Sequence, residues 1–387
     1  MKILYLSRGR CPDDQIGYHT AFQNAKSEGV DVECFDLPFI GFSEKHGWDG
    51  LYAEIIRITD EWRPDVVFFQ FFHGIKPSSP VDCIKRLKQS GSRPLVFGSQ
   101  GDLFDVKLFG NWGRRPEKPM VDLAVNADAF FSSSMGAFSD YLVAQGARNV
   151  VFLPHAFSLQ HFHGVDFTAG GKKKFDVSMV CSVSLSKRYL IGSMIHKYDR
   201  YKAVESLWRR YGQRFGLYGS GWRHPACLGA IPFRRQVDAF IGSKCAVDAP
   251  PPINEVYYAS DRPFFIAGCG IPLVQYYTPR FEKILREGEH VEFVRNHDNV
   301  SDVCAKILSR SQEELDAQGV ATRDLILHRH ITERRVDTII SVAETIRDIR
   351  SGKMPLDAGL ANLRLWHFLP GTDMDTELSF AVANWRG

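Results

Sequence analysis

The sequence predicts an α/β protein with two domains, each built on an open, mostly parallel β-sheet. Three observations support this fold class. The 387 residues suit two domains, at roughly 100–200 residues per domain. Strand and helix signals alternate in both halves of the chain. Several strand signals, such as DVVFFQFF at 65–72, are continuous apolar runs, which are typical of parallel strands covered on both faces.

In the first half, strand signals and helix signals alternate along most of the chain. Strands are expected at 2–7, 30–35, 65–72, 94–98, 128–132 and 149–153, and helices at 16–29, 51–62, 81–90 and 136–145. Gly29 ends the first of these helices, and Arg63-Pro64 stops the second. This repeated βα winding favours a parallel sheet over a β-hairpin architecture.

A second alternation follows a segment rich in Gly and Lys at 166–175. Strands are expected at 175–182, 215–218, 246–248, 271–275 and 291–294, and helices at 202–211, 260–268, 279–287, 300–309, 312–328 and 333–351. We interpret the Gly-Lys segment as a linker between domains at 1–165 and 175–350, the alternative being a surface loop within one domain. The aromatic tail at 355–387 is expected to pack back on the first domain.

Composition and charge are those of an ordinary globular chain. Hydrophobic residues make up 44% and charged residues 24%, which excludes a disordered chain, a collagen-like repeat and a disulfide scaffold. The 48 Lys and Arg against 45 Asp and Glu give a net charge of +3. Bulk charge therefore does not indicate a nucleic-acid-binding protein, and any phosphate must be bound at a local basic site. The 28 Phe residues are expected mainly in core strands.

The cysteines and the hydropathy pattern indicate a cytoplasmic protein. The eight cysteines are scattered without a C-x-x-C pair, which favours reduced thiols over a zinc or redox site. The apolar start is too short for a signal-peptide core, and no apolar run approaches 18 residues, so no membrane span is expected. Peripheral attachment to a membrane stays open.

Two segments of the second half place cations or glycines directly after predicted strands. Lys187 and Arg188 follow one strand, where two cations can neutralise a diphosphate. Gly219 and Gly221 follow another strand, and such glycines permit a ligand to approach the backbone closely. Trp222 adds a ring that can stack on a base or a sugar. A solvated cation pair, and a plain turn with a core tryptophan, are the alternatives.

A third segment begins a predicted helix. Ser260 and Asp261 are good N-terminal capping residues, and Pro263 suits the first helical turn. Exposed N–H groups at a helix start bind phosphate, and Arg262 can add a bidentate contact. Plain helix capping is the alternative. Because ligands of open parallel sheets bind at the carboxyl ends of the strands, all three segments are expected in one cleft.

Taken together, residues 175 to about 342 resemble the nucleotide-sugar-binding domain of GT-B glycosyltransferases. The closest resemblance is to the CgeB-type (spore-maturation-like) branch, which is related to the retaining glycosyltransferases of family 4. The order of Ser182-x4-Lys187-Arg188, LYGSGW at 217–222 and SDRPFFIAGCG at 260–270 carries this resemblance. It implies two Rossmann-like domains with parallel sheets facing a central cleft, a C-terminal helix returning to the first domain, and a nucleotide-diphosphate sugar as co-substrate.

The chain departs from family 4 at two positions. Where the resemblance implies a pair of Glu residues that hold the donor ribose, this sequence has Tyr257 and Phe265. The ribose is then held otherwise, for example by Asp261, or the donor is atypical. Tyr257 and Asp261 are included among the expected donor-binding residues, and whether the reaction retains anomeric configuration stays open.

In the first half, the resemblance implies candidate catalytic residues in loops that face the cleft. Gly17 and His19 lie between the first strand and the first helix, where inverting relatives carry a His as general base, and Gly17 is expected to contact the donor. His73, Asp102 and His155 each follow a predicted strand. A carboxylate at a strand end can accept the proton of an acceptor hydroxyl. A structural hydrogen bond, such as helix capping by His19, is the alternative for each.

These expectations describe a cytoplasmic, hexosyltransferase-like enzyme that needs no cofactor beyond the nucleotide sugar. No metal is expected, because the alternating spacing of His161 and His163 is by itself a poor ligand set, and cationic side chains can neutralise the diphosphate. The acceptor is open among glycans, lipids, proteins, small metabolites and modified nucleic acids. A sugar-nucleotide epimerase of the same architecture and a catalytically silent sugar-nucleotide or glycan-binding protein are the alternatives.

Overall fold

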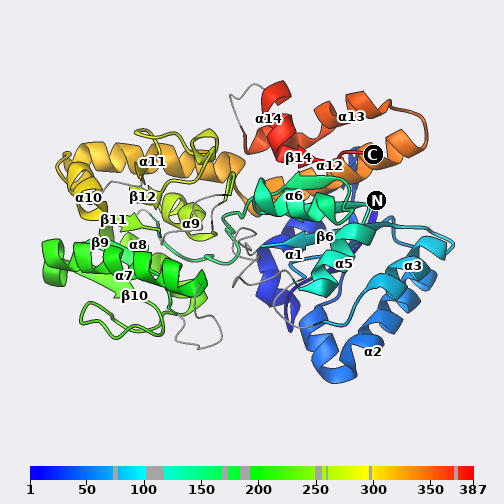
Figure 1. The fold of residues 1–387 in the computed structure, drawn as a ribbon, viewed down its shortest axis with the longest axis horizontal. Helices are drawn as coiled ribbons and strands as arrows, with labels where there is room; N and C mark the ends of the chain where they lie inside the picture. Colours follow the sequence, from blue (N-terminus) through cyan, green and yellow to red (C-terminus); the bar gives the residue numbers. More distant parts are fainter. Residues whose placement is uncertain are drawn as a thin grey trace. The chain divides into compact units, whose positions relative to one another are not determined.

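The computed structural model describes residues 1–72, 77–101, 117–167, 173–183, 192–248, 255–258, 260–295, 299–369 and 374–387. For residues 192–199, 366, 374–376 and 379 the description is limited to the backbone. The chain forms two compact units (Figure 1). Unit 1 contains the described residues of 1–154 and 332–387, and unit 2 contains those of 155–331.

This division differs from the one expected from the Gly-Lys segment at 166–175. Phe157 already belongs to unit 2, where its N–H donates to the His330 carbonyl oxygen at 2.8 Å and it forms a β-bridge with Ile331. The long helix that begins at Thr332 packs against the first helix of unit 1. The chain therefore changes unit at 154/155 and at 331/332.

Unit 1 is built on a seven-stranded sheet in the order β14-β8-β7-β6-β5-β1-β4. Its strands are β1 (Lys2–Leu6), β4 (Glu33–Asp36), β5 (Val66–Phe69), β6 (Leu95–Gln100), β7 (Ala129–Ser132), β8 (Val150–Phe152) and β14 (Val382–Ala383). All neighbouring strands pair in parallel except β14, which pairs antiparallel with β8. The short β14 thus brings the C-terminal tail to one edge of this sheet.

The strands of unit 1 form where the sequence is continuously apolar. Every residue of β5 and of β7 is buried, as expected for parallel strands covered on both faces. Gly98 in β6 is required by the packing, because a Cβ there would lie 2.9 Å from side-chain atoms of Leu123 and 3.0 Å from Phe130. Phenylalanines fill this core: Phe68, Phe69, Phe72, Phe97, Phe130, Phe131 and Phe152.

The helices of unit 1 match the expected ones in order but differ in length. They are α1 (Ile16–Gln23), α2 (Phe39–Trp62), α3 (Val81–Gln89), α5 (Lys118–Asn126), α6 (Ala137–Ala144), α12 (Thr332–Arg350), α13 (Leu356–Asn362) and α14 (Met374–Ala381), with 3-10 turns η1 (Pro12–Gln15) and η6 (Arg364–His367). The helix expected to reach Gly29 stops at Gln23. The chain then forms the hairpin of β2 (Lys26–Ser27) and β3 (Val30–Asp31), whose turn needs the left-handed φ of +81° at Gly29. The short α5 was not expected.

Unit 2 is built on a five-stranded parallel sheet in the order β10-β9-β11-β12-β13. The strands are β9 (Phe175–Val180), β10 (Phe215–Tyr218), β11 (Ser243–Val247), β12 (Leu273–Tyr276) and β13 (Val291–Val294). The helices are α7 (Gly192–Tyr211), α8 (Gln236–Ile241), α9 (Arg262–Gly268), α10 (Val300–Leu308) and α11 (Gln312–Arg329), with 3-10 turns η3 (Gly212–Arg214), η4 (Phe233–Arg235) and η5 (Phe281–Lys283). Apolar residues of α7 and α10 share one core with those of β9, β11 and β12, and thus cover one face of the sheet.

The helix expected at 279–287 is the one clear error in unit 2. Only the single turn η5 forms there, because Arg280 directly before it has a left-handed φ of +66°. The short helix α8 was not expected. Helix α7 begins at Gly192 rather than at the expected position 202, and the remaining strands and helices of unit 2 lie within a few residues of their expected positions.

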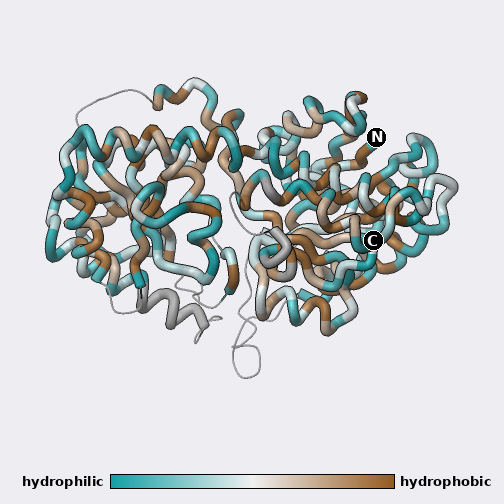
Figure 2. Tube along the Cα trace, turned by 90° about the horizontal axis from the view of Figure 1, so that it is seen from above, coloured by the Kyte–Doolittle hydropathy of each residue, from teal (hydrophilic) through white to brown (hydrophobic). Residues whose placement is uncertain are grey.

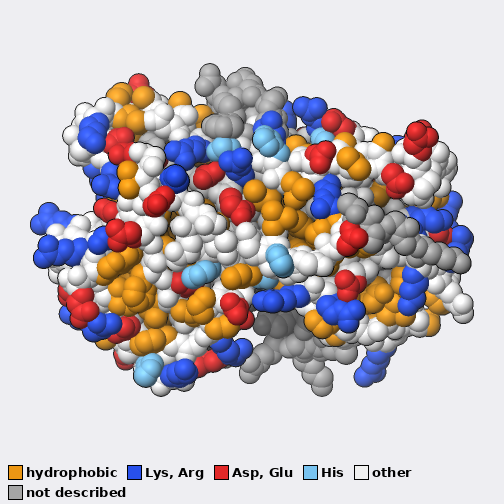
Figure 3. All heavy atoms as spheres, turned by 180° about the vertical axis from the view of Figure 1, so that it is seen from behind, with side chains coloured by type: hydrophobic (Ala, Val, Ile, Leu, Met, Phe, Trp, Pro, Cys, Tyr) orange, Lys and Arg blue, Asp and Glu red, His pale blue; other side chains and the backbone are white. Residues whose placement is uncertain are grey.

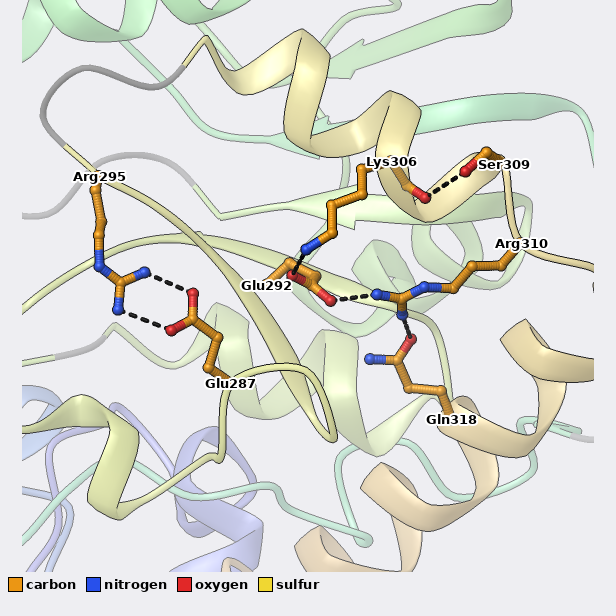
Figure 4. Close-up of polar contacts among 7 residues, drawn as sticks. All are labelled: Glu287, Glu292, Arg295, Lys306, Ser309, Arg310 and Gln318. Carbon is orange, nitrogen blue, oxygen red and sulfur yellow. Dashed lines mark hydrogen bonds and ion pairs between the residues drawn. The ribbon is translucent and has the colours of Figure 1, made fainter.

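A buried carboxylate ties β13 to the helices that follow it (Figure 4). Glu292 is 4% exposed and forms ion pairs with Lys306 of α10, at 3.2 Å, and with Arg310. Arg310 also donates to Gln318 Oε1 of α11 at 2.9 Å. This cluster fixes the positions of α10 and α11 relative to β13.

The surface agrees with the balanced composition. Figure 2 shows hydrophilic and hydrophobic positions alternating along the helices, as expected for helices with one buried face. Figure 3 shows cationic and anionic side chains interspersed over the face in view. Within the described ranges, no helix is long and apolar enough to span a membrane.

Candidate functional site

In unit 2, the loop after β10 lies directly against the segment after β9. A Cβ on Gly219, at φ +144°, would lie 1.9 Å from the carbonyl oxygen of Cys181. A Cβ on Gly221, at φ +80°, would lie 1.9 Å from that of Val183. Both glycines are therefore required by the contact between these two loops. Their expected contact with a ligand stays a prediction.

Trp222 belongs to the same contact. Its indole Nε1–H donates to the Cys181 carbonyl oxygen at 2.7 Å, and its ring lies edge-on to Tyr201 with centroids 4.9 Å apart. The indole also packs against the core between α7 and the sheet. These contacts fix the ring within unit 2, and its stacking on a base or sugar stays a prediction.

A buried ion pair lies at the carboxyl end of β11. Asp248 is fully buried, and its Oδ1 lies 3.0 Å from Nε of Arg262, the first residue of α9. Ser260 Oγ donates to the same oxygen at 3.4 Å. Asp261 stands at the N-cap position of α9, but its side chain makes no capping bond. The edge of the sheet thus holds Arg262 in place through a carboxylate.

Burial and charge act in opposite directions on this pair. Burial raises the pKa of the Asp248 carboxyl, and the guanidinium of Arg262 opposes that rise. Burial alone would lower the pKa of Arg262, but Asp248 raises it above its ordinary value. Arg262 is therefore a permanent cation at the strand ends, where open parallel sheets bind their ligands.

The two positions where the resemblance implies a Glu pair carry buried aromatic side chains. Tyr257 is fully buried, with a left-handed φ of +63°. Phe265 is 3% exposed and lies among aromatic rings, with centroid distances of 5.1 Å to Phe162, 5.5 Å to Phe233 and 6.3 Å to Phe157. Neither position therefore offers a carboxylate to a ribose.

In unit 1, three polar side chains meet at the carboxyl ends of β1 and β4. His19 Nδ1 lies 2.8 Å from Asp36 Oδ2, and Ser7 Oγ donates to Asp36 Oδ1 at 2.5 Å. The Asp36 side chain is 4% exposed and that of His19 is 28% exposed. Burial raises the pKa of Asp36, while the hydrogen bonds from Ser7 and His19 lower it. Gly17 and His19 lie within α1 itself, not in the loop that precedes the helix.

This arrangement suits proton transfer. A carboxylate that holds one ring nitrogen of a His fixes the orientation of the ring and leaves the other nitrogen for a substrate proton. The 28% exposure of His19 leaves part of its side chain open to solvent. Asp36 is therefore the residue that orients His19.

A second polar network lies at the ends of β1 and β5. The Tyr5 hydroxyl donates to Gln70 Oε1 at 2.6 Å, and Gln70 Nε2 donates to Gln15 Oε1 at 3.3 Å. Arg8 Nη1 donates to the carbonyl oxygen of Phe71 at 2.8 Å. Burial raises the pKa of the Tyr5 phenol, so this hydroxyl stays a donor at neutral pH. The network fixes the backbone beside Ser7 and His19.

The other expected site residues divide into described and undescribed ones. His155 is half-buried at the start of unit 2. His73, Asp102, Lys187 and Arg188 lie outside the described residues. No group of three or more His, Cys, Asp and Glu side chains suitable for a metal is found in the part of the chain that the structure describes.

Asp36 and Asp248 were not among the site residues predicted from the sequence. Asp36 directly follows one expected strand and Asp248 ends another, so a search for carboxylates at strand ends would have found both.

Part of the chain matches a known protein family. Residues 200–341 match a family described as glycosyl transferase-like. This segment includes Arg200, Gly219, Gly221, Asp248 and Arg262. No match is found among curated proteins.

Several solved structures are similar to this chain over most of its length. Sucrose-phosphate synthase from Thermosynechococcus elongatus aligns over 91% of this chain and 100% of its own, with TM-score 0.57 and 12% identity. HepE from Anabaena, solved with UDP, aligns over 90% of this chain and 100% of its own, with TM-score 0.54 and 13% identity. The N-terminal domain of Candida albicans trehalose-6-phosphate phosphatase aligns over 91% and 96%, with TM-score 0.52 and 10% identity. The chain thus has the GT-B fold, with parallel sheets in two Rossmann-like halves, and the expected fold class is confirmed.

Proposed function

We propose that the protein is a glycosyltransferase that moves a sugar from a nucleotide-diphosphate donor to an acceptor. The observation that carries this proposal is the match of residues 200–341 to a glycosyl transferase-like family. Among proteins of the same fold, HepE is solved with UDP and glucose and with UDP-glucose. We further propose a hexosyl donor, membership of the CgeB-type branch and a cytoplasmic location.

We place the donor at the carboxyl edge of the sheet of unit 2. Arg262, held by Asp248 at 3.0 Å, supplies a fixed cation there. Lys187 and Arg188 are proposed to add charge from the segment after β9, and Ser260 a hydroxyl beside α9. Such cations stabilise the negative charge that develops on a leaving diphosphate, so the proposed reaction needs no metal.

We assign the acceptor to unit 1, with His19 as the general base. Asp36 binds Nδ1 of His19 at 2.8 Å, which leaves Nε2 to accept a proton from the acceptor as it attacks the sugar. The carboxylate also stabilises the imidazolium that results. Attack assisted by a base in this way inverts the anomeric carbon, so this assignment predicts an inverting enzyme.

The test measures turnover of nucleotide sugars. The protein is incubated with UDP-, GDP-, ADP-, CDP- and dTDP-sugars without acceptor, and slow release of free nucleotide diphosphate is followed. We expect release from at least one donor, and a fall of at least about tenfold in His19→Gln, since general bases contribute roughly 10²–10⁴-fold. His46→Gln is the matched control, because His46 lies exposed on α2 of the same unit.

Two results would contradict the proposal. If no nucleotide sugar binds or raises the melting temperature, the donor site does not exist. If His19→Gln and His46→Gln turn over equally, His19 is not the base.

A catalytically silent nucleotide-sugar-binding protein is the second candidate function. The apolar positions of Tyr257 and Phe265 favour it, because no carboxylate stands there to hold a ribose. Binding of a nucleotide sugar without any turnover, with or without a panel of acceptors, would support this candidate over the transferase.

A further inference from the structure

Arg200 of α7 lies at the carboxyl end of β9, beside the glycine loop. Its Nη1 donates to the carbonyl oxygen of Ser182 at 2.8 Å. Ser182 Oγ in turn accepts from the backbone N–H of Ser220 at 3.0 Å. The half-buried Arg200 is thereby held between the ends of β9 and β10.

Polar atoms without partners gather at the same edge of the sheet. Asp248 Oδ2 and Arg200 Nε are buried and have no hydrogen-bond partner in the described ranges. The same holds for both amide atoms of Gln275, which is fully buried on β12. Because Val247 pairs with Val274, Asp248 and Gln275 are next to each other across the two strands. Of these atoms, Arg200 Nε and Gln275 Nε2 are donors, which the oxygens of an anionic ligand can satisfy.

Arg200 adds a cation to this edge of the sheet. Asp248 neutralises Arg262 through their ion pair. The hydrogen bond of Arg200 goes to a neutral carbonyl, and no ion pair of Arg200 is found among the described residues. Arg200 is close enough to Asp248 to oppose the rise in its pKa that burial causes. Asp261, half-exposed at the start of α9, is another acid near Arg262.

We propose that Arg200 binds the diphosphate of the donor together with Arg262, and that Asp248 is the positioning residue that fixes Arg262. This inference rests on the proposed function and names groups of the same site. A guanidinium presents its N–H donors in a fixed fork that matches phosphate oxygens, and Arg200 still has Nε to offer. The guanidinium of Arg200 on α7 and that of Arg262 on α9 would bind the diphosphate from either side of the end of β11.

The test compares two arginines of the same helix. Arg209 also lies on α7, but its side chain is 81% exposed and pairs with Glu205 at 3.7 Å. Calorimetry measures the dissociation constants of UDP, GDP, ADP, CDP and dTDP, of the corresponding nucleosides, and of inorganic pyrophosphate. For the diphosphate that binds best, Arg200→Ala should weaken binding roughly ten- to a hundredfold, as expected for charge-assisted hydrogen bonds. Arg209→Ala should bind like the wild type.

The nucleoside and the conservative variant separate phosphate binding from folding. Arg200→Ala should leave nucleoside affinity unchanged, and Arg200→Lys should recover part of the diphosphate affinity, because it restores the charge without the fork. If Arg200→Ala fails to fold, Arg200→Lys is the variant that tests the inference. We then expect Arg200→Lys to lose affinity for the diphosphate and to keep its affinity for the nucleoside. Asp248→Asn should also lower the affinity for the nucleoside diphosphate. The same substitution should lower this affinity less in a protein that already carries Arg262→Met.

The outcomes distinguish this inference from the proposed function. If the wild type and Arg200→Ala bind a nucleoside diphosphate equally tightly, the inference is wrong, but the proposed donor site is not contradicted. If Arg200→Ala loses as much affinity for the nucleoside as for the diphosphate, the inference is also wrong, since Arg200 would then only support the fold. Wild-type protein that binds no nucleoside diphosphate and no pyrophosphate overturns the inference and the proposed function together.

Discussion

Asp248→Asn is expected to destabilise unit 2 by about 3 kcal/mol. A separation of 3.0 Å between Arg262 Nε and Asp248 Oδ1 corresponds to about 5 kcal/mol of attraction at an effective dielectric constant of about 20. Breaking a buried pair costs roughly 3–5 kcal/mol, because the remaining charge is left uncompensated. We take the lower end, since the Arg262 side chain is 22% exposed and water can screen the guanidinium.

The assay is urea unfolding followed by hydrogen exchange of β11 and β12, where the Asp248 N–H bonds the Val274 carbonyl oxygen at 2.9 Å. Arg262→Met alone should cost at least as much, because it leaves a fully buried carboxylate alone. The double variant should lose less than the sum of the two by about 2 kcal/mol or more. Asp302→Asn is the control, because its pair with Arg210 is exposed and such pairs contribute little.

Two results would refute this reasoning. If Asp248→Asn loses no more stability than Asp302→Asn, the buried pair does not hold the end of β11. If the losses of the single variants simply add, Asp248 and Arg262 act independently, and the carboxylate does not fix the guanidinium.

Three further outcomes are expected. Gly219→Ala should lower stability by about 2 kcal/mol or more, because its Cβ would lie 1.9 Å from the Cys181 carbonyl oxygen at φ +144°, and an unchanged melting temperature would contradict this loop contact. Glu292→Gln should speed hydrogen exchange in α10, since Lys306 and Arg310 lose their buried counter-ion, and unaltered exchange would show that the cluster does not anchor the helix. Burial lowers the pKa of His367 from 6.5 to about 4, so the unfolded chain binds this proton more readily and stability should fall between about pH 6.5 and pH 4. His367→Gln should flatten that part of the curve of unfolding free energy against pH, and an identical curve would exclude His367 as its cause.

The sequence was sufficient for most of the sheet strands because their signal is local. The run at 65–72 predicts a buried parallel strand from its own residues, and β5 lies within it. Where tertiary contacts determine the local backbone conformation, the local sequence pattern does not predict the structure. The helix expected over 279–287 is replaced by one 3-10 turn, since Arg280 takes a left-handed conformation that no local pattern announces. The change of unit at Thr332 likewise follows from packing of α12 on α1.

The candidate site shows the same limit. His19 and Arg262 stand out in the sequence because imidazole and guanidinium groups have specific chemistry at a strand or helix end. The carboxylates that hold these two groups do not stand out in the sequence, since Asp36 and Asp248 are two among 45 acidic residues. Their burial and their partners appear when strands distant in sequence are brought together.

Both units use the same construction, and its energetic balance bears on function. In each, a buried Asp at or just beyond the end of a strand holds a side chain from a helix, His19 in unit 1 and Arg262 in unit 2. Burying a carboxylate is unfavourable, and apolar residues of similar volume often stabilise a fold equally well or better. The gain from these two pairs is therefore in orientation: one fixes a ring nitrogen for the proposed proton transfer, and the other fixes a cation for the proposed binding of phosphate. Replacing each Asp by Asn should then reduce turnover by more than its effect on folding accounts for at temperatures where both variants remain folded.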